Sequence, residues 1–203
     1  MFFAIKTLDH PDSGALREKL REAHLDYLDS FAKETVYDGP FLTDDGGHEL
    51  GSFKILELAD RAAAQAHIDD EPFITGGLQH GDEVWRYEPV VAHDWRNCPR
   101  TPGLTAAMVL AFDNRGGAPL RERIAQREAE WFAGIGTCLT AGMLVSDDGG
   151  TALGTLLMFE TPDMDAAHRT WEGSPALQEG LFGRIDIHRW RFGRTFDRLK
   201  PRH

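Results

Sequence analysis

The chain contains the same unit twice. The stretch "GPFLTDDGGHELGSFKILELAD", which begins at Gly39, aligns without a gap with "GMLVSDDGGTALGTLLMFETPD", which begins at Gly142. At this constant offset of 103 (142 − 39), 15 of the 52 positions from Gly39 to Val90 are identical. Upstream, "LREKL" from Leu16 faces "LRERI" from Leu120 at an offset of 104. Solenoid repeats have periods of roughly 20 to 50 residues, so this longer period predicts a duplicated domain.

Each copy predicts the same order of elements. In the first, "MFFAIKTL" is strand-like, a helix follows from about Ser13 to Ala32, and "TVYDGPFLT" and "SFKILELA" are two strands joined by a Gly-Asp hairpin turn. Asp60 is placed to cap the next helix, "RAAAQAHID", which Pro72 ends before the last strand, "DEVWRYEPV". The fold class is therefore α+β, with two ferredoxin-like βαββαβ units.

The predicted organisation has four parts: a first unit at 1–91, a linker at 92–103, a second unit at 104–193 and a basic C-terminal tail at 194–203. We expect the tail to be a solvated extension rather than a nucleic-acid contact. A four-stranded sheet with two helices on one face leaves the other face bare. Two copies in one chain can cover each other, so we expect antiparallel sheets packed face to face as an intrachain pseudo-dimer. Each half should hold a cavity between helix and sheet.

Composition excludes several classes of protein. The net charge of −11 argues against nucleic acid or an anionic membrane as the partner. The N-terminus has no apolar region of the length of a signal peptide, and no apolar stretch approaches a membrane span of about 18 residues. Cys98 and Cys138 show no CxxC spacing. A cytoplasmic location is expected.

One histidine lies on an apolar helix face. His24 follows Leu20 by four residues and precedes Leu28 by four, so helical periodicity directs it inward. A buried imidazole without a partner costs free energy. His24 is therefore either a structural histidine bonded to a neighbour or a functional group.

The segments "REAHLDYL", "GPF", "GSFKILELA", "AAAQAHIDDEPFITGGL" and "DEVWRYEP" together resemble the YciI-like (YCII-related) family of small ferredoxin-like proteins. The resemblance covers about 90 residues of the first half, whereas the second half keeps the framework and loses the motifs. Members are usually homodimers in the dimeric α/β-barrel group. The chain resembles such a dimer fused in tandem, and further homo-oligomerisation is left open.

The resemblance implies a His–Asp pair as the active site. The histidine maps to His24 and the family arginine to Arg21. The family places aspartate directly before the proline, whereas "DDEPF" has Glu71 there and Asp70 one residue earlier, so either carboxylate is a candidate partner. Pro40 and Phe73 stand in two further family motifs and, with Arg21, are candidate substrate-binding residues; Arg21 would hold an anionic group.

The second half lacks both members of this pair. Glu128 stands at the position of His24, and "GSPA" from Gly173 replaces "DEPF". Joint loss indicates that the two residues are coupled, which a structural pair would also show. Glu128 is expected to reach solvent or to pair with Arg123 or Arg127. We therefore expect one competent cavity, in the first half.

Three functions are compatible with these residues. A histidine whose pKa is raised by a carboxylate can transfer protons near neutral pH. The resemblance suggests an elimination or isomerisation of a small aromatic or carbonyl compound, such as dehydrochlorination of a halogenated hydroquinone, without a cofactor. The alternatives are a non-catalytic small-ligand-binding or accessory protein and a cofactor-free oxygenase. No metal is expected, because the histidines have no HxH, HxxxH or HExxH spacing.

Overall fold

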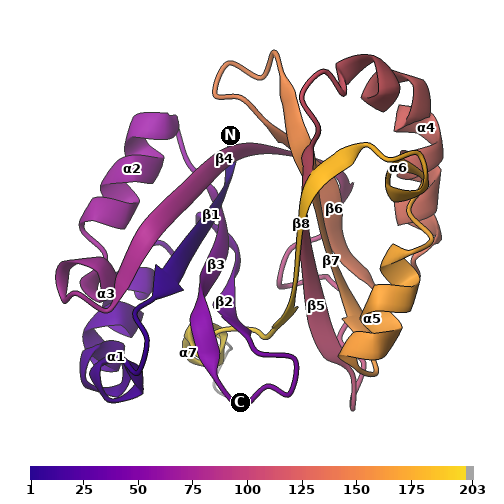
Figure 1. Cartoon of the computed structure of the whole chain (residues 1–203). Helices are drawn as coiled ribbons and strands as arrows, with labels where there is room; N and C mark the ends of the chain where they lie inside the picture. Colours follow the sequence, from indigo (N-terminus) through magenta and orange to yellow (C-terminus); the bar gives the residue numbers. More distant parts are fainter. Residues whose placement is uncertain (200–203) are drawn as a thin grey trace. The chain divides into compact units, whose positions relative to one another are not determined.

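The computed structural model describes residues 1–199 of the 203 (Figure 1). It divides into two compact units: Met1–Trp85 together with the segment from Arg191, and Arg86–Trp190. These bounds differ from the predicted ones, because each unit keeps the end of a strand that the sequence assigns to the other half. From Arg86 onward the fourth strand pairs with a strand of the second unit. After Arg191 the chain pairs with the first unit instead.

The first unit is built around a central strand. Its elements are β1 (Phe2–Asp9), α1 (Gly14–Asp29), β2 (Thr35–Leu42), β3 (Glu49–Glu57), α2 (Arg61–Asp69), α3 (Pro72–Thr75), the beginning of β4 (Gln79–Ala92) and α7 (Thr195–Leu199). Strand β3 pairs antiparallel with both β1 and β2. The apolar core between this sheet and its helices includes Phe3, Ile5, Leu56 and Ile68.

The second unit repeats the order. Its elements are β5 (Thr105–Asp113), α4 (Ala118–Gly134), β6 (Cys138–Val145), β7 (Ala152–Thr161), α5 (Met164–Trp171), α6 (Pro175–Gln178) and β8 (Phe182–Trp190). Strand β7 pairs antiparallel with β5 and β6, and β5 also pairs with β8. The predicted α+β class with two βαββαβ units is confirmed.

Equivalent side chains begin the short helices of both units. The carboxylate of Asp60 accepts a hydrogen bond from the Ala63 N–H at the start of α2, and Asp163 does the same for Ala166 in α5. Pro72 opens α3 directly after α2 ends. Because Pro is favoured in the first turn of a helix, the acid–proline motif starts a new helix and places the preceding residue at its N-cap.

The expectation of a solvated tail is wrong for the part that the structure describes. Thr195 and Phe196 are buried, and α7 packs on α1. Arg198 forms ion pairs with three α1 carboxylates, those of Glu22, Asp26 and Asp29. The last four residues of the predicted tail, 200–203, lie outside the described residues.

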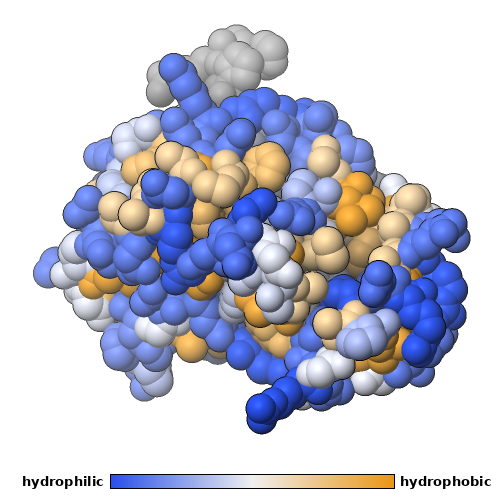
Figure 2. Space-filling model, turned by 90° about the horizontal axis from the view of Figure 1, so that it is seen from above, coloured by the Kyte–Doolittle hydropathy of each residue, from blue (hydrophilic) through white to orange (hydrophobic). Residues whose placement is uncertain are grey.

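The surface in Figure 2 is largely hydrophilic, with smaller hydrophobic areas between the polar residues. This agrees with a chain in which 27% of residues are charged. No helix within residues 1–199 is long and apolar enough to cross a membrane.

Candidate active site

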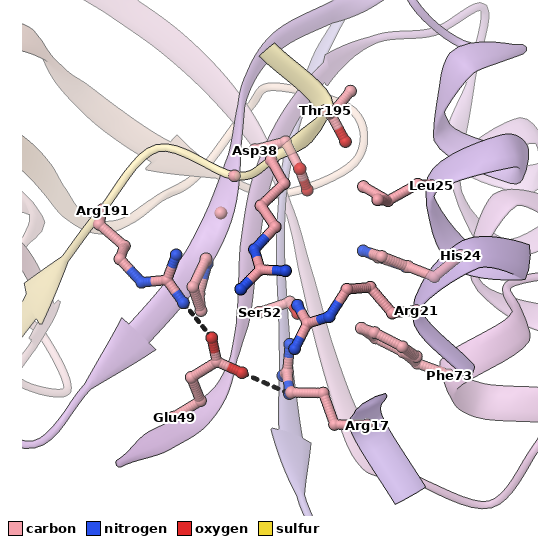
Figure 3. A pocket seen from close by; sticks show the side chains of 14 residues that line it. Arg17, Arg21, His24, Leu25, Asp38, Glu49, Ser52, Phe73, Arg191 and Thr195 are labelled. Atoms are coloured by element: carbon pink, nitrogen blue, oxygen red, sulfur yellow. Dashed lines mark hydrogen bonds and ion pairs between the residues drawn. The ribbon is translucent and has the colours of Figure 1, made fainter. Parts of the chain in front are cut away.

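A narrow pocket lies between α1 and the sheet of the first unit (Figure 3). Residues of α1, β2, β3, α3 and the segment after β8 line it, and its volume is about 20 Å³. That is room for about one water molecule. A cavity between helix and sheet was predicted for this half of the chain.

A larger open cleft of about 760 Å³ adjoins the pocket and shares four of its lining residues, Arg17, Arg21, Glu49 and Arg191. Glu49 accepts ion pairs from both Arg17 and Arg191, which Figure 3 draws as dashed lines. These two ion pairs to Glu49 therefore lie where the cleft meets the pocket.

His24 and Glu71 are in direct contact. The His24 Nδ1 atom is 2.6 Å from Glu71 Oε1, and both side chains are buried. Glu71 is the N-cap residue of α3, and its Oε1 also accepts a hydrogen bond of 3.2 Å from the Phe73 N–H. The Phe73 ring stacks on the imidazole at 3.8 Å between centroids. The imidazole is thus held at its edge by a carboxylate and on its face by an aromatic ring.

The structure brings Glu71, and not Asp70, to His24. Asp70 is the exposed C-cap residue of α2. Because α2 ends there and α3 begins at Pro72, only the residue at the N-cap of α3 turns inward. The acid–proline spacing of the sequence leaves this choice open, and the break between the two helices decides it.

The environment of the pair sets its protonation. Burial alone would raise the pKa of Glu71, but Lys54, with Nζ at 4.0 Å, and the hydrogen bond to His24 lower it to about 2. For His24, burial outweighs the carboxylate and lowers the pKa from its ordinary 6.5. The expected rise is therefore wrong, because it considered the carboxylate without the desolvation.

These shifts determine which ring nitrogen is available. An ionised carboxylate only accepts hydrogen bonds, so Nδ1 of the neutral imidazole carries the hydrogen and donates it to Glu71. Nε2 then has a free lone pair. In Figure 3 the His24 ring projects from α1 into the pocket. The arrangement suits a general base.

Among the charged residues of the site that the sequence analysis missed, two lie buried on neighbouring strands. Asp38 on β2 stands opposite Lys54 on β3 in the antiparallel register, and both side chains are buried. Burial raises the pKa of Asp38, which lines the pocket. The available signal was their position: Asp38 and Lys54 interrupt otherwise apolar strands.

The predicted substrate-binding residues all lie at the pocket. Arg21 is half-buried and pairs with the exposed Glu18, while Pro40 is a buried residue of β2. The guanidinium of Arg17 lies over the Phe73 ring at 4.8 Å from its centroid. Arg21, Pro40 and Phe73 line the pocket, and a role in substrate binding is proposed for them.

A comparison with protein families gives a match in the first part of the chain. Residues 1–88 match the family described as the YCII-related domain. The chain is thus similar to YCII-related domains over 88 of its 203 residues. No curated protein matches the chain.

Solved structures share the fold over nearly the whole chain. A "putative monooxygenase" from Lactobacillus acidophilus is 14% identical with a TM-score of 0.57, and the match covers 94% of this chain and 92% of that one. A chlorite dismutase from Candidatus Nitrospira defluvii, in complex with imidazole, is 12% identical with a TM-score of 0.56, covering 94% and 90%. At such identities these dimeric α/β-barrel proteins are similar in fold alone.

A further solved structure matches only part of the chain. The 5-chloro-2-hydroxyhydroquinone dehydrochlorinase from Burkholderia phenoliruptrix is 29% identical, and the match covers 43% of this chain and 94% of that one. Its TM-score is 0.42.

The second unit differs from the first at the site but keeps part of its framework. Arg121 pairs with Asp113 as Arg17 pairs with Asp9. Glu128, at the place of His24, accepts a hydrogen bond of 3.4 Å from Arg121. The expected pairing of Glu128 with Arg123 or Arg127 is wrong, because those two arginines reach the exposed Glu179 instead.

The remaining charges of the site are replaced together. Ala141 and Leu157 stand opposite each other where the first unit has its buried Asp–Lys pair. Ser174 occupies the N-cap position of Glu71. The Arg–Asp pair is thus common to both units, whereas the charged residues around the imidazole occur only in the first.

Among residues 1–199, no group of three or more histidine, cysteine or acidic side chains is arranged to hold a metal ion. The "TDDGGH" stretch forms an exposed hairpin turn in which Asp45 accepts hydrogen bonds from Thr43 and the Gly47 N–H.

Proposed function

We propose that this protein is an acid–base enzyme in which His24 removes a proton from a small aromatic or carbonyl compound in an elimination or isomerisation. The observation that carries the proposal is the contact of 2.6 Å between His24 Nδ1 and the ionised Glu71. It directs a neutral imidazole, with Nε2 free, into a pocket. A general base needs this combination of protonation state and access.

The neighbours of the pair have supporting roles. Glu71 fixes the tautomer and stabilises the imidazolium that forms when Nε2 takes a proton. Lys54 keeps Glu71 ionised, since the two side chains lie 4.0 Å apart. Arg21 attracts an anionic group of the substrate from the adjoining cleft. The resemblance to the family suggests dehydrochlorination of a halogenated hydroquinone as one reaction of this type.

Asp38 provides an acid in the same pocket as the proposed base. Its pKa is raised by burial, whereas that of His24 is lowered by burial. Two titratable groups whose pKa values are displaced in this way allow one to accept a proton while the other donates one. In the proposed reaction Asp38 is the acid of the pocket and His24 is the base.

One observation favours a different function, a non-catalytic small-ligand-binding protein. The pocket at His24 has a volume of about 20 Å³, which admits a water or a single functional group rather than a ring. In this alternative the ligand lies in the larger cleft and the buried pair is structural.

The first experiment is an NMR titration of the His24 ring in the wild type and in Glu71→Gln. We expect His24 to titrate in the folded protein with a pKa below 6.5, and its pKa to fall further, by about a unit, when Glu71 is neutralised. Asp70→Asn is the matched control, because Asp70 neighbours Glu71 in sequence but is exposed, and it should leave the titration unchanged. Chloride release from chlorinated hydroquinones is measured in parallel.

Two results would contradict the proposal. The first is a His24 ring that does not titrate until the protein unfolds. The second is a turnover that His24→Gln leaves intact. Either result with intact ligand binding would favour the binding protein.

A further inference from the structure

The chain segment after β8 is fixed along the edge of the pocket. The N–H groups of Arg191 and Gly193 donate hydrogen bonds of 3.2 and 2.8 Å to the carbonyls of Pro40 and Asp38. Gly193 lies so close that a Cβ there would be 2.5 Å from Asp38 Oδ2. Residues that follow Gly193 are therefore held against the site by the backbone and are not a loose end.

Two polar side chains of this segment line the pocket. Thr195 lines the pocket with 0% of its surface exposed, and its Oγ1 has no hydrogen-bond partner among the described residues. Figure 3 shows this hydroxyl turned toward the side on which Leu25 and His24 lie. Arg194, whose side chain is exposed and whose charge acts on that of Glu18, lines the same pocket. Burying an unpartnered hydroxyl costs stability, so its position calls for a ligand atom.

We propose that Thr195 and Arg194 hold the substrate oxygen on which negative charge develops when His24 takes a proton. The inference rests on the proposed function and names its substrate class: a carbonyl or phenolic compound that reacts through an enolate or phenolate.

For a carbonyl substrate, the C–H bond breaks and its proton goes to His24 Nε2. The electron pair forms a C=C bond, and the carbonyl π pair moves to the oxygen. A hydroxyl and a guanidinium donating to that oxygen stabilise the charge where it appears.

The second unit differs at these positions. In β4 the register shifts between Pro89 and Val91, so Val91 pairs with Ala141, the counterpart of Asp38, and takes the place of Gly193. Ala92 and His93 therefore stand at the positions of Arg194 and Thr195. The Ala92 side chain cannot donate a hydrogen bond, and His93 Nδ1 lies 3.3 Å from the Cys138 carbonyl oxygen. The arginine and the hydroxyl therefore accompany the imidazole of His24, and the unit with Glu128 has neither at these positions.

The test uses 4-nitrophenol, whose absorbance reports its ionisation without any turnover. The wild type should bind the phenolate about tenfold more tightly than the phenol and so lower the apparent pKa of the bound probe. Arg194→Gln and Thr195→Val should each lose most of that preference, and Thr195→Ser, which keeps the hydroxyl, should retain it. Arg123→Gln, an exposed arginine of the second unit, is the control for the change of net charge.

Thermal unfolding separates this role from a structural one. Thr195→Val replaces an unpartnered hydroxyl with a methyl group, so the ligand-free variant should be at least as stable as the wild type. Weaker phenolate binding without lower stability would support the inference. A variant that loses stability together with binding would assign Thr195 to the fold and overturn it.

The remaining outcomes distinguish the two proposals. If the wild type shows no preference for the phenolate, or if Arg194→Gln and Thr195→Val leave it unchanged, the inference fails, whatever His24 does. If the preference depends on both residues but His24→Gln leaves turnover unaffected, the oxygen site stands and the acid–base function fails.

Discussion

At His24, burial and a neighbouring carboxylate act in opposite directions on the pKa of the imidazole. Burial prevails, so the pKa lies below 6.5 and the ring is neutral at pH 7. Since the proposed base must be unprotonated and the proposed acid, Asp38, must be protonated, kcat/KM for a substrate found in the chloride-release screen should fall below pH 6.5, where His24 takes up a proton, and should fall again on the alkaline side, where Asp38 ionises. A pH–rate profile checks this. An acid limb centred above pH 6.5 would show that Glu71 dominates over burial.

Single residues also show what sequence can predict. The position of His24 between Leu20 and Leu28 predicts that it is buried, and it is. Which carboxylate contacts His24, that of Asp70 or that of Glu71, could not be predicted, because the contact depends on where α2 ends and α3 begins. Asp38 and Lys54 lie far apart in sequence and meet only through the strand register. Their buried charges were visible as polar positions in apolar strands, but their proximity to His24 was not.

Helix α2 carries a second buried histidine, which should lower the stability of the fold at acidic pH. His67 has no hydrogen-bond partner for either ring nitrogen among the described residues and packs against Tyr27 and Phe31. Burial lowers its pKa to about 3. The unfolded chain, with an ordinary pKa near 6.5, binds the proton first as pH falls. Stability is therefore retained above pH 6.5 and is lost progressively between pH 6.5 and 3.

Replacing that histidine should remove this pH dependence from α2. Through this effect His67→Leu should be about 2 kcal/mol more stable than the wild type at pH 5. Above pH 6.5 the free energies of unfolding of the two proteins should change with pH in nearly the same way. Urea unfolding at pH 5, 6 and 8 measures it. His48→Leu, in the exposed hairpin, should follow the wild type. Parallel curves for wild type and His67→Leu would show that His67 takes up its proton in the folded state as easily as in the unfolded chain.

Elements differ in how well their pattern predicts them. Long amphipathic segments and capped helices were predicted because their signals are local: periodicity, Asp60 before α2, and Pro72 at the start of α3. Helix α7 has five residues, too few for a periodic pattern. Tertiary contacts hold this helix in place: Phe196 is buried, and Arg198 forms ion pairs with carboxylates of α1. A basic segment with distant acidic partners reads in the sequence as a solvated tail.

For the whole molecule, the internal repeat predicted two units of one fold, since a duplicated framework keeps its Gly, Pro and capping positions. Where the units begin and end was not predictable, because β4 is one continuous strand of 14 residues that serves both. The repeat also separates framework from site. Arg17 with Asp9 and Arg121 with Asp113 recur in both units and belong to the framework.

This asymmetry predicts a single ligand site per chain. The first unit offers Arg194, Thr195 and a neutral imidazole to an anionic oxygen. The second offers the carboxyl group of Glu128, whose pKa is raised by burial, with Arg121 already bonded to it. Calorimetric titration with 4-nitrophenolate should therefore give a stoichiometry of one. Glu128→Gln should leave this binding unchanged, and Arg194→Gln should weaken it. A stoichiometry of two would mean that the arginine common to both units, and not the segment after β8, binds the anion.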